Sequence, residues 1–395
     1  MMRSSKTFYQ AGMTLVEIMI ALVIGLVVTL AVMSVMSVSE GRKRTTTSAN
    51  DMSQSGAFAL YQIDKLIRSA GSGFGQLPQY KPAVFPLGCK LNASKGGAQI
   101  WPGTTTLQSP FDTVSKNYRL APIIITKGAA TASDVLITMA GSSGYGEIPI
   151  RLNATPAAPS ISMATTFSFN ANDFVLLYEP TSPASCLLEQ VATSFVANST
   201  PLTLGGTFYT TNGVDRNLGN FSVAAVAVNL GQKPAFNLLA VGSNYTLYNF
   251  DLINSDPTAT PNIVADGVYD LRAVYGIDAA NGTLPGPITW VSPGTSPYTS
   301  AELMDGSAAA AARLQTIKAI RIGLIMRSPL LEKEIPKAGG GTQPVSPATF
   351  TLFSDLETAT PGITYTKNVA AADRNYRYRV FETLIPVRNL MLSRP

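Results

Sequence analysis

The residues of this chain whose types and spacing indicate chemistry stand at the start of a long apolar segment. Gly12 ends a short leader that contains Arg3 and Lys6, and Glu17 follows five positions after Gly12. A carboxylate in a lipid-facing helix is costly, about 2.5–3.5 kcal/mol at the bilayer centre, so Glu17 needs a cation or a proton. Cleavage after Gly12 would free the α-amine of Met13 one helical turn from Glu17. We therefore predict a charge pair created by proteolysis, within one chain or between neighbouring copies.

The apolar segment that follows is long enough to cross a membrane. No residue from Ile18 to Val38 is charged, and a bilayer core takes about 20 residues of helix. A cleavable secretory signal has a shorter apolar core, of roughly 7–15 residues. The nearest basic residues beyond the segment, 42–44, lie about 37 Å from Glu17 along a helix and cannot neutralise it. An ordinary signal-anchor helix with an incidental glutamate is the alternative.

This stretch resembles a known processing signature. Gly12-Met13-Thr14-Leu15-Val16-Glu17-Ile18-Met19-Ile20 is similar to the prepilin signature of type IV pilins and type II secretion pseudopilins. The resemblance implies that a prepilin peptidase cuts after Gly12 and methylates the new N-terminus at Met13. It also implies that Glu17 pairs with the amine of an adjacent subunit during assembly. Methionine at position 13 departs from the usual phenylalanine but is also apolar.

Later segments extend the resemblance to PilW-type minor pilins. They are residues 67–71, 267–278, 320–328 and 378–390. The resemblance implies a subunit that works with other minor pilins, the major pilin and the inner-membrane assembly platform. Such a subunit primes assembly and sits at the pilus tip, often with a large adhesin, in twitching motility and adhesion. The alternatives are a minor pseudopilin of a type II secretion system, a component of a DNA-uptake pilus, and a surface enzyme or binding module on an ordinary anchor.

Composition narrows the chemistry of the chain. It has 395 residues, of which 46% are hydrophobic and 13% charged, with a formal net charge of +5. This bias is too weak to indicate nucleic acid. The absence of histidine excludes histidine-ligated zinc, a Ser-His-Asp triad and a Cys-His dyad within the chain. We expect neither enzymatic activity nor a cofactor.

Two cysteines, Cys89 and Cys186, are the only ones in the chain. An even pair in an exported domain favours a disulfide, and two buried thiols are the alternative. Both cysteines lie in segments that the sequence pattern indicates as loops, so we expect a bridge to fix irregular backbone.

The sequence predicts four parts. They are a leader (1–12), an apolar filament-core or transmembrane helix (13–38), an amphipathic continuation of that helix (39–71) and a β-rich head (72–395). In the continuation, apolar or small residues recur at spacings of three and four and form one face: Met52, Gly56, Ala59, Ile63, Leu66 and Ala70. Division of the head into two lobes near residue 206 stays open.

The head reads as a succession of short strands bounded by turn residues. Strand-like runs occupy residues 122–126, 134–139, 173–178, 224–230, 237–241, 245–250, 263–278, 317–326 and 375–386, with a weaker one at 163–169. One helix is expected at 300–315 and a mobile loop at 336–348. We predict an α+β, pilin-like fold in which a long N-terminal helix packs on an enlarged antiparallel β-rich head.

Two other groups of polar residues permit functional interpretations that we do not favour. The pairs Asp251 with Asp256 and Asp266 with Asp270 lack the dense oxygen spacing of a calcium loop. Arginines 374, 377, 379 and 388, with tyrosines 376 and 378 between them, permit either a DNA-binding strand or a strand with one solvated face, and we favour the latter.

The charges that flank the apolar segment favour the opposite orientation. The resemblance and the cysteine pair outweigh them, because long domains are translocated largely regardless of flanking charge. We therefore expect a single-pass inner-membrane protein with its head in the periplasm, or at the pilus tip on the cell surface.

Overall fold

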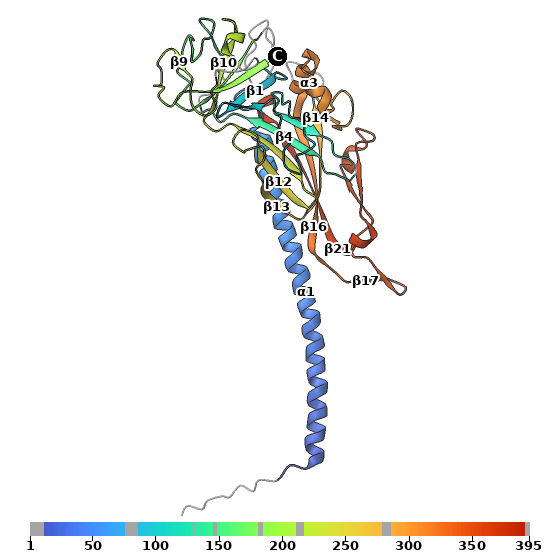
Figure 1. Cartoon of the computed structure of the whole chain (residues 1–395). Helices are drawn as coiled ribbons and strands as arrows, with labels where there is room; N and C mark the ends of the chain where they lie inside the picture. Colours follow the sequence, from blue (N-terminus) through green and yellow to red (C-terminus); the bar gives the residue numbers. More distant parts are fainter. Residues whose placement is uncertain are drawn as a thin grey trace, which may run out of the picture. The chain divides into compact units, whose positions relative to one another are not determined.

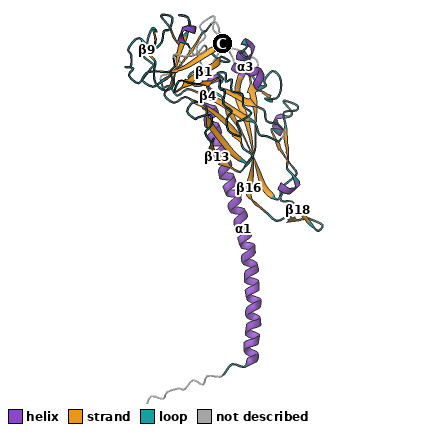
Figure 2. Cartoon of the chain, in the orientation of Figure 1, coloured by secondary structure: helices purple, strands orange, loops and turns teal. Residues whose placement is uncertain are grey.

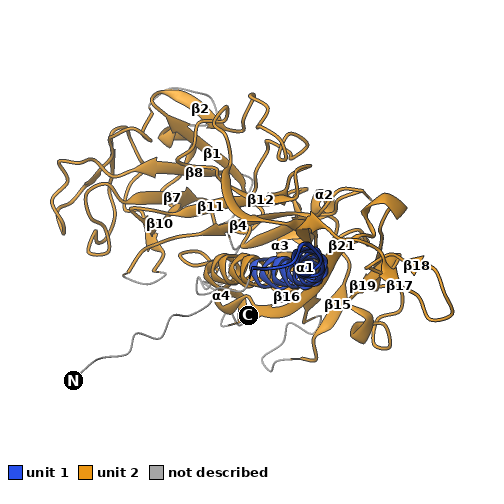
Figure 3. Cartoon of the chain, turned by 90° about the horizontal axis from the view of Figure 1, so that it is seen from below, with its two compact units in different colours: residues 1–51 blue, residues 52–395 orange. Residues whose placement is uncertain are grey.

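The protein consists of one long helix and a head built mainly of strands (Figures 1 and 2). The structure is a computed structural model that describes residues 12–75, 86–129, 131–144, 148–180, 185–210, 217–278 and 286–391. The chain forms two compact units, residues 1–51 and residues 52–395 (Figure 3). Of the predicted leader, only Gly12 lies within the described residues.

Helix α1 runs from Leu15 to Ser69. In the first unit its large apolar side chains, from Leu15 to Val38, are all exposed. By length and composition this helix is able to cross a membrane. A helix that is apolar all round needs lipid or other helices around it.

In the second unit α1 has one buried face, as the spacing predicts. Met52, Ala59, Ile63 and Ala70 are buried, and so is Gly56. Leu66 is half-buried and packs against the main core. Ile67, four residues after Ile63, is fully buried beside it, and the spacing did not include it. From residue 52 to residue 70, the same narrow face of the helix therefore packs against the head.

The C-terminal end of α1 is held by the end of the chain. The side chain of Asn389, in the short helix α4 (Arg388–Met391), donates hydrogen bonds from Nδ2 to the carbonyl oxygens of Ser69 (3.1 Å) and Ala70 (3.0 Å). These carbonyls lack partners within the helix. Lys318 Nζ donates to the carbonyl oxygen of Leu390 at 2.7 Å and anchors α4 in turn.

Three larger sheets form the described part of the head. The first has the order β2-β1-β8-β7-β10-β5, the second β13-β12-β11-β4-β3 and the third β15-β14-β16-β21. Neighbouring strands are antiparallel except for β1 and β8, which are parallel. In the first sheet the strands are β1 (Lys90–Lys95), β2 (Ala98–Trp101), β5 (Ile150–Arg151), β7 (Phe174–Tyr178), β8 (Ser185–Gln190) and β10 (Val226–Gly231).

The second sheet consists of β3 (Ile123–Thr126), β4 (Val135–Ala140), β11 (Ala235–Val241), β12 (Thr246–Asp251) and β13 (Asn262–Asp266). In the third sheet the strands are β14 (Val268–Ile277), β15 (Thr289–Val291), β16 (Ile317–Leu331) and β21 (Tyr376–Pro386).

Smaller elements connect and flank these sheets. Three strand pairs are β6 (Ser160–Ile161) with β9 (Leu202–Thr203), β17 (Ile335–Pro336) with β18 (Thr342–Gln343), and β19 (Thr349–Leu352) with β20 (Tyr365–Asn368). The short helices are α2 (Ser300–Leu303), α3 (Ala308–Thr316) and the 3₁₀ turns η1 (Leu218–Asn220), η2 (Ser354–Leu356) and η3 (Ala371–Asp373).

The first sheet separates two hydrophobic cores. Along β7, Phe174, Leu176 and Tyr178 face the main core, which also receives α1. The alternate residues Val175 and Leu177 face a second core. This is the period of two expected of a strand buried on both faces. A third core lies against the third sheet and includes Phe353 of the β19–β20 region.

The α+β, pilin-like fold class is confirmed by this arrangement, and most predicted strands are present within one or two residues. In β16, Ile320, Ile322, Leu324 and Met326 are all fully buried on one face, as their alternation predicts. The proposed lobe boundary near residue 206 stays a prediction. That position lies between β9 and β10.

Four predicted elements were wrong. The single run expected at 263–278 is two strands in different sheets, β13 and β14, which are separated at Gly267 with φ of 78°. The helix expected at 300–315 is two helices, because Gly306 between them has φ of 84°, which a residue with a side chain rarely adopts. Residues 336–348 are not a loop throughout, since β17 and β18 pair within this region. The weak run at 163–169 is mostly turns, and Met163 makes only an isolated bridge with Leu152.

Candidate functional site

The residues of the predicted processing site lie at the very start of α1. Gly12, Met13 and Thr14 precede the helix, and all three are exposed. Thr14 is the N-cap residue, because its carbonyl oxygen accepts hydrogen bonds from the backbone N–H of Glu17 (3.1 Å) and Ile18 (3.2 Å). The bond that a peptidase would cut, after Gly12, therefore lies in non-helical backbone just before the helix.

Glu17 and Thr14 bind each other reciprocally. The Glu17 backbone N–H donates to Thr14 Oγ1 at 3.3 Å, and the Thr14 backbone N–H donates to Glu17 Oε2 at 3.3 Å. This pattern is a capping box, which satisfies two donors that a helix start leaves unpaired. The sequence analysis did not consider it, although Thr-x-x-Glu before an apolar run is its signature. Glu17 thus has a local partner before any cleavage.

One of the basic residues beyond the apolar segment, Arg44, has a local partner. Arg44 pairs with Glu40 one turn earlier, at 3.5 Å between Nε and Oε1. Both side chains are well exposed. Within the described residues, the hydrogen bonds of the Glu17 carboxylate run to Thr14.

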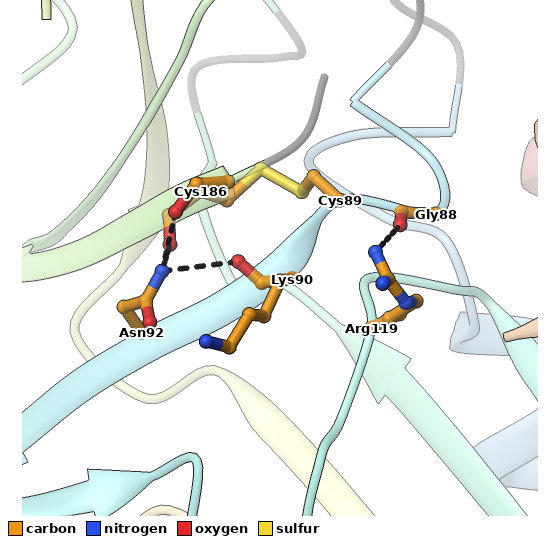
Figure 4. Close-up of a disulfide and its surroundings, with 7 residues drawn as sticks. Gly88, Cys89, Lys90, Asn92, Arg119 and Cys186 are labelled. Carbon is orange, nitrogen blue, oxygen red and sulfur yellow. Dashed lines mark hydrogen bonds between the residues drawn. A yellow bond between two sulfur atoms is a disulfide. The ribbon is translucent and has the colours of Figure 1, made fainter. Parts of the chain in front are cut away.

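The predicted disulfide between Cys89 and Cys186 is present (Figure 4). Both cysteines are fully buried, and their Cα atoms are 5.6 Å apart. The expectation of a loop context was wrong, because Cys186 lies in β8 and Cys89 directly precedes β1. These two strands are parallel neighbours, with Leu91 opposite Cys186. Parallel pairing between segments so far apart in sequence leaves no local signal.

Polar side chains support the backbone around the disulfide (Figure 4). Asn92 Nδ2 donates to the carbonyl oxygen of Cys186 at 3.2 Å, and Arg119 Nη1 donates to that of Gly88 at 2.8 Å. The bridge therefore stabilises a regular, buried part of the first sheet.

A buried ionic network, which the sequence analysis missed, joins the second and third sheets. Arg272 in β14 contacts Asp134 (Nη1 to Oδ1, 2.9 Å) and Asp270 (Nε to Oδ1, 3.2 Å). Lys367 and Tyr365 of β20 bind the second oxygen of Asp270, at 3.0 and 2.9 Å. Burial raises the pKa of the Asp134 carboxyl, while the Arg272 charge acts to lower it.

The carboxylate pairs weighed as calcium ligands have other roles. Asp270 is occupied by the cations just described, whereas Asp266 accepts from Thr246 Oγ1 at 2.8 Å. Asp251 accepts from the backbone of Ile253 and Asn254, and Asp256 from Thr258. Within the described residues, no group of three or more His, Cys, Asp or Glu side chains is placed to hold a metal ion.

The C-terminal tyrosines and arginines do not form one surface. Tyr378 packs against Tyr269 on one face of β21, with ring centroids 5.0 Å apart. On the opposite face, Arg379 donates to Ser53 of α1 and Arg377 pairs with Glu332 at 2.6 Å. Arg374 bonds the carbonyl oxygen of Ser346, and Arg388 lies in α4.

Comparison with known families identifies two matching models. The prokaryotic N-terminal methylation motif matches residues 7–33. The model described as Type IV Pilus-assembly protein W matches residues 238–389. No curated protein and no solved structure matches the chain. The matches cover the start of α1 and the segment from β11 to α4, and residues 34–237 lie outside both.

Proposed function

We propose that this chain, which is a PilW-like type IV pilin, acts as a minor pilin that primes pilus assembly and sits in the complex at the pilus tip. The family is a structural component of type IV pili. Partners in this role are other minor pilins, the major pilin, the inner-membrane assembly platform and prepilin peptidase. A large tip adhesin is a further partner, and twitching motility and adhesion are the processes served.

The observation that carries the proposal is the combination at the start of α1. The carboxylate of Glu17 and an apolar surface exposed from Leu15 to Val38 occur in one helix, and the predicted cleavage site after Gly12 lies directly before it. In lipid, apolar side chains give little preference for a neighbouring helix over the acyl chains. A buried charge that needs a counter-ion does give such a preference.

The mechanism is physical and proceeds in three steps. Peptidase cleavage after Gly12 frees the amine of Met13, which is then methylated. Glu17, until then held by Thr14, neutralises the amine of a neighbouring subunit. The apolar helix then exchanges lipid for the helices of the filament, with the head in the periplasm and later at the tip.

A deletion of the gene in its own host tests this proposal. We expect loss of surface pili and of twitching, both restored by the intact gene. Secretion of hydrolases should be unchanged. Lost secretion with normal pili would contradict the proposal in favour of a type II pseudopilin. Normal pili with lost DNA uptake would favour a role in DNA uptake.

A further inference from the structure

Residues 141–234 form an excursion from the second sheet. Strands β4 and β11 are antiparallel neighbours, and Ala140 at the end of β4 lies opposite Ala235 at the start of β11. The chain therefore leaves and returns at one point, where a hairpin turn would otherwise suffice. The excursion supplies β5, β7, β8 and β10 to the first sheet and encloses the second core. Neither family match reaches it.

A polar cleft with a volume of about 370 Å³ opens at the base of this excursion. All its lining residues belong to the excursion: Ser142, Ser143, Gly144, Asn170, Asp173, Asn229, Gly231, Gln232 and Lys233. The lining residues come from three segments. Residues 142–144 follow β4, residues 229 and 231–233 precede β11, and Asn170 and Asp173 precede β7. Apart from the two glycines, all these residues are polar or charged.

The floor of the cleft is a fixed pair of polar side chains. Asp173 and Asn229 are each 3% exposed. Asn229 Nδ2 donates to Asp173 Oδ2 at 2.8 Å and to the carbonyl oxygen of Ser168, while Asn229 Oδ1 accepts from the Gly231 N–H at 2.6 Å. The Asn170 N–H also donates to Asp173 Oδ2, at 2.8 Å. The positions of the carboxylate and the amide are thus set before any ligand arrives.

The mouth of the cleft carries exposed donors. Gln232 and Lys233 are both exposed, and each is held by a hydrogen bond, through the side chain of Gln232 and the backbone of Lys233. Gln232 Nε2 donates to the carbonyl oxygen of Ala171 at 3.1 Å, and the Lys233 N–H donates to Ser142 Oγ at 3.0 Å. The ammonium group of Lys233 and the carboxylate of Asp173 give the lining no net charge.

This lining excludes several classes of ligand. A pocket for an apolar side chain of a partner is lined by apolar side chains, whereas the residues that line this cleft are polar, charged or glycine. Nucleic acid needs an excess of cations, whereas Lys233 is balanced by Asp173. Asp173 is the single carboxylate among the lining residues, and calcium prefers several oxygen ligands with more negative charge. A ligand rich in hydroxyl groups both donates and accepts, which suits the mixture of carboxylate, amides, hydroxyls and ammonium.

We propose that the cleft binds one neutral hexose unit of a saccharide, with Asp173, held in place by Asn229, accepting from one of its hydroxyl groups and with Lys233 and Gln232 bonding others at the mouth. The volume lies near the lower end of the range for small-molecule sites, about 300–1,000 Å³. The proposal goes beyond the assembly role, since binding at this cleft requires neither cleavage after Gly12 nor a filament. Its failure would leave that role untouched.

The test uses the full chain in a zwitterionic detergent that carries no sugar headgroup. Glucose, galactose, mannose and N-acetylglucosamine are titrated separately, and saturation-transfer NMR detects contact. We expect at least one hexose to bind with a dissociation constant of about 1 mM. Lys233→Ala, Gln232→Ala and Asp173→Asn should each weaken that binding about tenfold, because each removes a hydrogen-bonding or charged group of the lining.

A matched control is Lys337→Ala, an exposed lysine of the β17–β18 hairpin, which should bind as the original chain does. Lys233→Ala and Gln232→Ala alter exposed side chains, and their unfolding midpoints should not move. Two results would overturn the proposal. One is the lack of saturable binding of all four hexoses. The other is binding that the two mouth variants leave unchanged.

Discussion

At the scale of single residues, Glu17 has two separable roles. Its carboxylate closes the capping box with Thr14, and its charge is proposed to select a neighbour. Glutamine also serves in a capping box but carries no charge. The two roles therefore respond differently to one substitution.

We predict that Glu17→Gln and Glu17→Val both reduce incorporation into sheared pili by about tenfold or more, since the charge pair is lost in both. The amount in filaments is measured against the amount in membranes by immunoblot. Glu40→Gln, at an exposed glutamate later in α1, serves as the control and should assemble normally. Normal assembly of Glu17→Gln would leave only the capping role.

Because of the buried network, we expect the stability of the head to depend strongly on Arg272. We predict that Arg272→Met lowers the free energy of unfolding by about 3–5 kcal/mol, because Asp134 and Asp270 lose their main counter-ion while buried. Arg321→Met is the control, since Arg321 pairs with the more exposed Asp355 and Glu382 and should cost about 0–1 kcal/mol. Denaturant titration of both variants measures the difference. Equal losses would contradict this account of the network.

The sequence placed the residues of the N-terminal signature correctly in relation to α1, because the signature is local. Gly12, Thr14 and Glu17 fall within six consecutive residues, and the cleavage and charge pairing expected of Gly12 and Glu17 stay predictions. The Arg272 network could not be found in this way. Its members at 134, 270 and 367 are brought together only when β14 and β20 approach the residue before β4.

At the scale of elements, α1 packs closely on the third sheet at Gly56. A Cβ atom there would lie 2.7 Å from Phe381 Cε2 and 3.1 Å from Met326 Cγ. Gly41, in the same helix, has no atom within 4 Å of the equivalent position. Alanine is otherwise favoured over glycine in a helix, by about 1 kcal/mol.

We predict opposite effects of the same substitution at these two sites. Gly56→Ala should lower the unfolding midpoint of the head, with a cost of about 1–3 kcal/mol from overpacking. Gly41→Ala should leave the midpoint unchanged or raise it slightly. Calorimetry of the two variants in one detergent compares them. A midpoint for Gly56→Ala at or above that of the original chain would contradict the close approach.

Periodicity was sufficient for elements with a strong local pattern. The stripe of α1 and the alternation in β16 were both predicted from spacing. The errors have local causes that outweigh the pattern. Helix formation in the alanine-rich segment is interrupted at Gly306 by its positive φ, and the glycines at 339–341 make a turn between two short strands. Leu66 and Ile67 are adjacent in the helix, and the spacing of apolar residues does not show which of the two is more deeply buried.

At the scale of the whole molecule, the disulfide links the excursion to the segment before it. Cys186 lies in the excursion and Cys89 outside it, 97 positions earlier. The bridge closes a long loop in the unfolded chain, which stabilises the folded state by limiting the unfolded one.

We predict that the double variant Cys89→Ala, Cys186→Ala loses about 2–5 kcal/mol of unfolding free energy. Addition of a reductant under denaturing conditions should bring the original chain to the same value and should not affect the variant. Denaturant titration with and without reductant measures both. Identical curves for the original chain in the two conditions would show that the bridge does not contribute.

The topology of the head lay beyond sequence reasoning. Strand positions were largely predicted, but their order was not, since β4 pairs with β11 across the excursion and β1 pairs with β8 inside it. Such pairings depend on contacts between distant segments, which leave no local pattern. The polar cleft at the base of the excursion was missed for the same reason.

The central claim is that proteolysis after Gly12 creates the counter-ion that Glu17 requires. The most direct measurement is mass spectrometry of the N-terminal peptide of the protein, isolated from its own host with prepilin peptidase present. The account predicts a mature chain that starts at Met13 and carries an N-methyl group. A chain that starts at Met1, or at any residue other than Met13, would contradict it.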